Sequence, residues 1–263
     1  MSAVAERTSV FVERRRRAEA LAARHEYARE PLTLLAALLD GQERAFERAR
    51  TDRPAIDELA PYVVRSALPD VMSAVMSSGT ETLREAVLLR FHEGDLEGLV
   101  HTWLRGDEQS GTDAFIARAA AAPVLEALPE VAHALKSVDR EQLCPVCGGL
   151  PQVSVFGETS EALVTSQRRL VCSRCAGEWV YPRMTCVSCG ETESAKLVVF
   201  ADQQQVPYLR LDACETCKRY VANIDLRLEP GAVPLVDEIT ALPLDIDAAQ
   251  RGYTKITTNV MGL

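Results

Sequence analysis

The chain has 263 residues and a formal net charge of −9. That length is enough for one or two domains, each with a hydrophobic core. Residues 1–140 carry 18 basic and 23 acidic side chains, and residues 141–263 carry 11 and 15, so both halves are acidic. Neither half has the basic excess that binding to nucleic-acid phosphates requires, which argues against that function.

The sequence indicates neither a membrane span nor an export signal. No apolar run reaches the roughly 18 residues that cross a bilayer. Four consecutive arginines, Arg14 to Arg17, are not followed by an apolar stretch, so neither a secretory nor a twin-arginine signal is expected. We therefore expect a cytoplasmic protein, in which paired cysteines are more often metal ligands than disulfides.

Residues 1–140 predict an all-α domain of about six helices, because they lack cysteine and are rich in Ala, Leu, Glu and Arg. Apolar side chains at helical spacing predict one helix that starts near Pro31. Another helix is expected to end at Gly94, and the next to start with Asp95 as its N-cap. Further prolines are expected to mark the boundaries of the remaining short helices: Pro54, Pro61, Pro69, Pro123 and Pro129.

Several conspicuous side chains of this half receive structural interpretations. The run from Arg14 to Arg17 is expected on the solvated face of a first helix, and Trp103, like Trp179 further on, in the core. The four histidines have no ligand-like spacing and are expected to be structural or exposed: His25, His92, His101 and His133.

All eight cysteines fall in four C-x2-C pairs. Twenty-four residues separate the first two pairs, and the same number separates the last two. A shift of 42 positions places each cysteine of the first set on one of the second, so the chain contains an internal repeat. The pairs are Cys144 and Cys147, Cys172 and Cys175, Cys186 and Cys189, and Cys214 and Cys217.

This spacing predicts two metal sites. A C-x2-C turn directs two thiolates at one point, and two such turns close a tetrahedral S4 site. The sequential grouping assigns Cys144, Cys147, Cys172 and Cys175 to one metal, and Cys186, Cys189, Cys214 and Cys217 to the other. An interleaved grouping, in which the first and third pairs share a metal, is the alternative, and disulfides are a third interpretation. Tetrahedral S4 suits Zn(II) and equally a single iron.

The expected fold class is α+β: the all-α helical domain (1–140) is followed by two tandem rubredoxin-like or zinc-ribbon-like four-cysteine metal modules (141–184 and 185–226) and by a C-terminal acidic segment and tail (227–263). Short apolar runs between the cysteine pairs predict small strands, around Val153, Leu163, Val164, Leu170, Val198 and Leu209. Residues 234–250 suggest a helical segment interrupted by Pro243. Each module is too small to fold by apolar burial alone, so bound metal is expected to stabilise it. The helical half is expected to survive metal removal, because its core should contain no ligand.

The residue after each C-x2-C pair is expected to matter for the turn. Gly148 and Gly190 follow the first and third pairs, where a positive φ lets backbone N–H groups face the sulfurs. Ala176 and Lys218 stand at the second and fourth, which predicts that the two halves of each site differ. An S4 site has no open coordination position, so hydrolytic catalysis is not expected. No set of nucleophile, base and orienting residue is apparent, and we expect a protein that is not an enzyme.

Four segments resemble the FdhE family of formate dehydrogenase accessory proteins: LCPVCG, RRLVCSRCAGEWVYPRMTCVSCG, CETCKRYV and the closing GYTKITTN. Glu178, Trp179 and Arg183 match the family pattern, whereas the acidic pair Asp237 and Glu238 stands in different surroundings. The resemblance implies two rubredoxin-like, iron-binding modules. It also implies a cytoplasmic maturation factor, or chaperone, that contacts the catalytic subunit of a respiratory formate dehydrogenase before export.

Three functions follow as hypotheses. The first is a non-enzymatic assembly factor for a formate dehydrogenase. The second is a rubredoxin-like electron-transfer partner, and the third is a zinc-ribbon nucleic-acid-binding protein, which the acidic charge disfavours.

Overall fold

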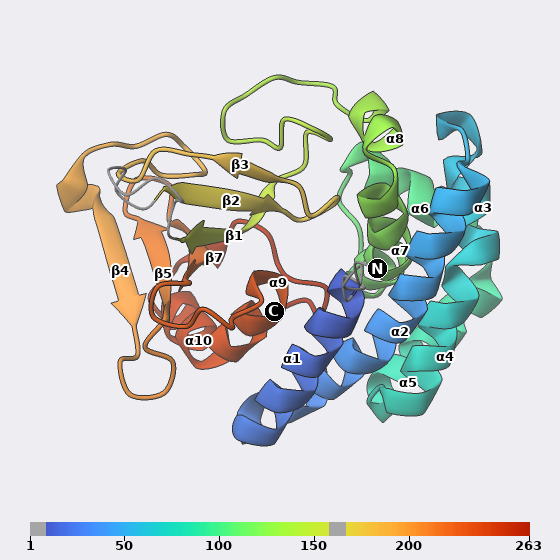
Figure 1. Cartoon of the computed structure of the whole chain (residues 1–263), viewed down its shortest axis with the longest axis horizontal. Coiled ribbons are helices and arrows are strands. Elements are labelled where there is room, and N and C mark those ends of the chain that lie inside the picture. Colours follow the sequence, from blue (N-terminus) through green and yellow to red (C-terminus); the bar gives the residue numbers. More distant parts are fainter. Residues whose placement is uncertain (1–8, 158–166) are drawn as a thin grey trace, which may run out of the picture.

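The computed structural model describes residues 9–157 and 167–263, so the expected strand residues Leu163 and Val164 lie outside the described residues. Helices gather on one side of the molecule and a β-sheet on the other (Figure 1). The last two helices, α9 (Pro234–Asp237) and α10 (Leu242–Gln250), lie beside the sheet, and α9 also contacts the first helix.

Residues 9–140 form eight α-helices rather than the six expected. The bounds are α1 (Val10–Arg24), α2 (Arg29–Asp52), α3 (Leu59–Ser66), α4 (Leu68–Ser78), α5 (Glu81–Glu93), α6 (Leu96–Arg105), α7 (Gly111–Ala127) and α8 (Pro129–Ala134). Three predicted helix ends are confirmed: α2 starts near Pro31, α5 ends at Gly94, and Asp95 is the N-cap of α6. The Asp95 carboxylate accepts a hydrogen bond from the Gly98 N–H at 3.0 Å. The expectation that Pro123 separates short helices is wrong, because it lies inside α7. A proline there removes one backbone hydrogen bond of the helix, and the packing of this largely buried helix offsets that loss.

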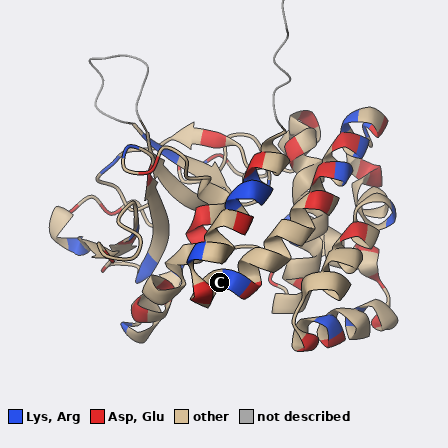
Figure 2. Cartoon of the chain, turned by 60° about the horizontal axis from the view of Figure 1, so that its bottom comes forward, with Lys and Arg blue, Asp and Glu red and all other residues tan. Residues whose placement is uncertain are grey.

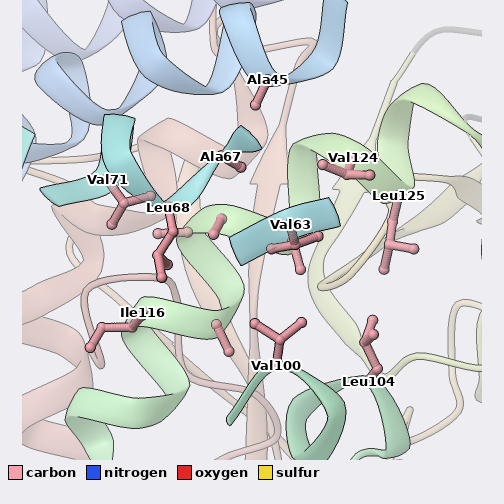
Figure 3. Close-up of a cluster of buried hydrophobic side chains, with 14 of the residues drawn as sticks. Ala45, Val63, Ala67, Leu68, Val71, Val100, Leu104, Ile116, Val124 and Leu125 are labelled. Carbon is pink, nitrogen blue, oxygen red and sulfur yellow. The ribbon is translucent and has the colours of Figure 1, made fainter. Parts of the chain in front are cut away.

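The helical half buries a continuous apolar core. Figure 3 shows side chains from α2, α3, α4, α6 and α7 converging on it, among them Val63, Leu68, Val100 and Ile116. All four side chains are at most 1% exposed. Burial of this kind is the main source of stability for short helices, which are marginal in isolation.

The remainder of the chain forms a seven-stranded sheet whose strand order is β3-β2-β1-β6-β5-β4, with β7 paired to β6. The strands are β1 (Pro151–Phe156), β2 (Arg168–Cys172), β3 (Glu178–Val180), β4 (Leu197–Ala201), β5 (Leu209–Cys214), β6 (Arg219–Asp225) and β7 (Thr254–Lys255). Pairing within β1–β3 and within β4–β6 is antiparallel.

The two repeats join through one parallel pairing, between β1 and β6, in which Val153 lies opposite Ala222. Each repeat contributes three consecutive strands, so the repeats stand side by side in the sheet. The seven-stranded sheet is therefore continuous across both modules. The domain boundaries at residues 140, 184 and 226 stay a prediction.

The acidic pair of the C-terminal segment connects the sheet to the helices. Asp237 is fully buried and accepts hydrogen bonds from Arg17 Nη2 at 2.6 Å and from the Tyr208 hydroxyl at 2.8 Å. Burial alone would lower the pKa of Arg17, but the bond to Asp237 raises it above its ordinary value. Glu238 is equally buried and pairs with Lys255 Nζ at 3.0 Å.

The expectation that Arg14 to Arg17 cover a solvated face is wrong for two of the four. Arg14 makes a two-bond contact with Glu126 on α7, with both distances 2.8 Å. Arg14 and Arg17 are each only 12% exposed, because Arg14 faces α7 and Arg17 faces α9. Arg16 is exposed, as expected.

The predicted fold class is confirmed: a helical N-terminal region is followed by a sheet that carries two groups of four cysteines. Acidic and basic positions are interspersed over the helices (Figure 2). Among the described residues, the helices are too short or too polar to cross a membrane.

Candidate metal centres

The structure brings the eight cysteines together in two groups of four. The first cysteine group is Cys144, Cys147, Cys172 and Cys175, and the second cysteine group is Cys186, Cys189, Cys214 and Cys217. Within each group all four Sγ atoms lie within 4.8 Å of one another. The grouping is sequential, and each repeat closes on itself.

The sulfur positions fit a tetrahedral metal. Metal–sulfur bonds of about 2.3 Å imply sulfur–sulfur edges of about 3.8 Å. In the first group the Sγ atoms of Cys147 and Cys172 are 3.4 Å apart. In the second, the Sγ atoms of Cys189 and Cys214 are 3.8 Å apart. A disulfide needs about 2.05 Å, and all eight cysteines are free, so the disulfide interpretation is wrong.

Crowded thiols shift one another's pKa values in opposite directions. Hydrogen bonds from neighbouring thiols, Cys147 first, lower the pKa of Cys144, and the corresponding bond to Cys144 raises that of Cys172. Burial raises the pKa of Cys186 to about 12. Four thiolates at these distances repel one another, so a bound cation is what would let all four ionise. Ligation of metal by these eight cysteines stays a prediction.

The four turns share one backbone conformation. The φ angles are +72° at Gly148, +79° at Gly190, +55° at Ala176 and +54° at Lys218. The N–H groups of Gly148, Gly190 and Lys218 each donate to the carbonyl of the first cysteine of their pair at 2.9–3.0 Å. The expectation that the two halves of each site differ is therefore wrong for the φ angle, which is positive at all four positions. The chain accepts a left-handed alanine and lysine because the turn demands that conformation.

The first cysteine group is part of the helical core. Its cysteines are at most 7% exposed and belong to the same apolar cluster as the side chains of α3, α6 and α7. Arg174, between Cys172 and Cys175, donates from Nη2 to the Trp103 carbonyl at 3.1 Å, and its guanidinium lies 5.6 Å from the Trp103 ring centre. The expectation that the helical core is separate from the candidate ligands is thus wrong, because the four cysteines of the first group pack into it. That expectation rested on position along the chain.

The second cysteine group lies nearer to solvent. Cys189 is exposed and Cys217 is half-buried, whereas Cys186 and Cys214 are buried. The Ser188 N–H donates to Cys186 Sγ at 3.4 Å, as the Arg174 N–H does to Cys172 Sγ at 3.3 Å. The two groups thus share local geometry and differ in their surroundings.

The other residues singled out in the sequence stay outside these groups. Among the described residues, no histidine joins a cluster of metal-ligating side chains. His25 is buried against Tyr27, and His133 contacts the Val146 carbonyl through Nδ1 at 3.1 Å. Trp179 is half-buried, and its indole N–H donates to the Glu141 carbonyl at 3.1 Å.

One important residue was missed. Arg168 is 3% exposed, and its Nη1 donates to the Thr185 carbonyl at 3.0 Å, which holds the loop before the second group. In the sequence it is a charged residue at the start of an apolar strand, and it begins one of the segments that resemble the FdhE family. The pattern alone does not indicate a buried position for it.

The fold and the sites define a helical protein with two tandem cysteine modules in one sheet. Residues 184–261 match the family model described as "FdhE, C-terminal domain". A protein FdhE homolog of Aquifex aeolicus is 37% identical over 119 residues, which is 45% of this chain and 41% of that protein. A Pseudomonas aeruginosa homolog is 29% identical over 206 residues, or 73% of this chain and 62% of that protein. Both alignments therefore span less than two thirds of the relative.

The fold also matches a solved structure. The crystal structure of the FdhE protein from Pseudomonas aeruginosa superposes with a TM-score of 0.68 at 23% identity, covering 96% of this chain and 95% of that one. That likeness concerns the fold, and the family model matches the second module and the tail. The predicted resemblance to the FdhE family is therefore confirmed, with residues 184–261 similar to the C-terminal domain of that family.

Proposed function

We propose that this chain is a cytoplasmic accessory factor for a respiratory formate dehydrogenase. It binds the catalytic subunit and assists its assembly or activation before export, without being an enzyme itself. The observation that carries the proposal is the FdhE C-terminal domain at residues 184–261, within a chain whose fold resembles FdhE over 96% of its length.

We further propose that the eight cysteines hold two metal ions, one in each cysteine group. The near-tetrahedral sulfur distances support this, and the resemblance favours iron, while the same ligands also suit zinc. Bound there, the metal supplies a cross-link that stabilises each module. With all four positions taken by sulfur, the site has no room for a reacting water, which supports a binding role over hydrolysis.

Co-purification tests the proposal directly. Metal-loaded full-length chain is used as bait against formate dehydrogenase catalytic subunit, and its metal content and formate-oxidising activity are measured on the same sample. We expect a complex with the subunit and no formate oxidation by the chain alone. A folded, metal-loaded chain that binds no such subunit, but does bind nucleic acid at physiological salt, would refute the proposal.

The cysteine variants require a control for folding. Cys186→Ser with Cys189→Ser removes ligands from the more exposed group and leaves the first group intact. We expect weaker capture of the subunit, with helical circular dichroism close to that of the unsubstituted chain. Capture that is lost only together with helicity would mean that unfolding, and not the module surface, caused the loss.

The exposure of Cys189 favours a second candidate, electron transfer through the second group. A tetrathiolate iron near the surface exchanges one electron with little rearrangement. Visible absorption of aerobically purified chain distinguishes red ferric tetrathiolate from colourless zinc. Reduction by a partner must then follow at a rate that depends on the second group, or this candidate fails.

A further inference from the structure

A basic groove lies beside the second cysteine group of this acidic chain. Its walls come from β4, β5, β6 and the loop that precedes Cys186, and its volume is about 100 Å³. Four arginines and a single aspartate line it: Arg168, Arg183, Arg210, Arg219 and Asp212. The local excess of positive charge contrasts with −9 for the whole chain.

Two of these arginines are already engaged. Asp212 pairs with Arg210 Nε at 2.9 Å and with Arg168 Nη2 at 3.4 Å. One carboxylate therefore serves two guanidinium groups and also accepts from Asn223 Nδ2 at 2.9 Å. The Asp212 carboxylate therefore has little capacity left to neutralise Arg183 and Arg219.

The other two arginines are exposed and have no carboxylate partner among the described residues. Arg183 lies over the Phe156 ring, with its guanidinium 4.8 Å from the ring centre. The Arg219 side chain has no ion pair in the described part of the chain. The backbone position of Arg183 is fixed, because buried Arg168 donates to the carbonyls of residues 182, 183 and 185.

The groove is also apolar. Val187, Val198 and Val221 line it, and two further lining side chains are more than half exposed, Met184 at 59% and Val199 at 53%. Exposed apolar side chains next to arginines that lack a carboxylate partner in the described part of the chain are typical of a surface that binds protein. Phosphate-backbone binding would instead use a longer basic track.

We propose that this groove docks a segment of a protein partner in which acidic residues are interleaved with aliphatic ones. The carboxylates pair with Arg183 and Arg219, and the aliphatic side chains cover Met184 and Val199. This deepens the proposed accessory function and rests on its premise that the chain binds a protein.

The test uses fluorescence anisotropy with the full, metal-loaded chain. The probe is a labelled peptide of about twelve residues with the repeat Glu-Glu-Leu-Leu, because successive side chains of an extended peptide point to opposite faces and this repeat gives each face both carboxylates and leucines. The control peptide has Gln in place of each Glu. We expect Arg183→Glu with Arg219→Glu to weaken binding of the acidic probe at least about tenfold, with added salt weakening it further. Arg16→Glu with Arg65→Glu, the same charge change at exposed positions on α1 and α3, should alter it less than about twofold.

Three outcomes would overturn the proposal: an unchanged affinity in the groove variant, equal binding of the Gln peptide, or tighter binding of single-stranded nucleic acid with the same sensitivity to the groove variant. Circular dichroism and metal content confirm that each variant is folded. If the formate dehydrogenase subunit binds but the acidic peptide does not, the docking inference fails and the accessory function stands. If the peptide binds and the subunit does not, the docking inference stands and the accessory function fails.

Discussion

The different surroundings of the two cysteine groups predict that metal leaves them at different rates. The sulfurs of the first group are buried in the helical core, whereas Cys189 of the second group is exposed. A chelator can approach the second group directly. It reaches the first only after the module separates from the helices, because ligand exchange needs access to the sulfurs.

The cost of that separation follows from the contacts that break. Three hydrogen bonds cross the junction, each contributing about 1 kcal/mol. They run from Arg174 to the Trp103 carbonyl, between His133 and the Val146 carbonyl, and from Arg118 to the Gln152 side-chain oxygen. The half-buried Val146 side chain contributes about 1 kcal/mol more. The sum of about 4 kcal/mol corresponds to release that is roughly a thousandfold slower.

Stopped-flow chelation with a metal-sensitive dye measures both rates in the full chain. A variant with Cys186→Ser and Cys189→Ser keeps only the first group, and one with Cys144→Ser and Cys147→Ser keeps only the second, which assigns the phases. We also expect helical circular dichroism to fall with loss of the first metal and not with loss of the second. Equal rates, or faster release from the first group, would refute the argument that burial controls access.

Gly149→Ala should disturb the first group, because a Cβ at this position would lie 2.9 Å from Cys172 Sγ. We expect denaturant titrations to give an unfolding free energy lower by about 1–3 kcal/mol, and one metal to be released faster. Lys255→Met should lower the unfolding free energy at pH 7 by about 3–5 kcal/mol, because it leaves Glu238 and Asp245 buried without their shared cation. The loss should shrink towards pH 5, since burial raises the pKa of both carboxyls above the unfolded value. The folded variant then binds more protons, and its stability falls as pH rises through the folded pKa.

Matched controls exist for both substitutions. Gly111→Ala adds the same methyl group where nothing lies within 4 Å, so metal release should be unchanged. Lys196→Met removes a half-exposed lysine that pairs with Glu193 and Glu191 at the surface, and it should change stability by less than about 1 kcal/mol at either pH. A pH-independent loss in the Lys255 variant would show that packing, and not charge, accounts for its effect.

The cysteine groups were predictable because their geometry is local. A C-x2-C turn places two sulfurs together whatever surrounds it, and a 42-residue repeat supplies a complete set. The helix signals at Gly94 and Asp95 were equally local, since each acts within one turn of the chain. These features depend on residues a few positions apart, which sequence patterns record directly.

Most of the incorrect expectations concerned contacts between distant residues. Arg17 is separated from Asp237 by 220 positions, and Arg14 from Glu126 by 112. No periodicity within α1 distinguishes an arginine that faces solvent from one that faces a buried carboxylate. The position of the first cysteine group within the helical core is hidden for the same reason, because the contact joins segments that look like separate domains.

The repeat therefore produced two sites with the same internal geometry and different surroundings. Parallel pairing of β1 with β6 sets the modules side by side, and it is the first that faces the helices. The first group joins its module to the helical core, so we expect its substitution to destabilise the whole chain. The second group lies beside the basic groove, where Arg183 and Arg219 are exposed. If the proposed partner binding is right, we expect substitutions at the second group to weaken binding without unfolding the chain, and substitutions at the first group to do both.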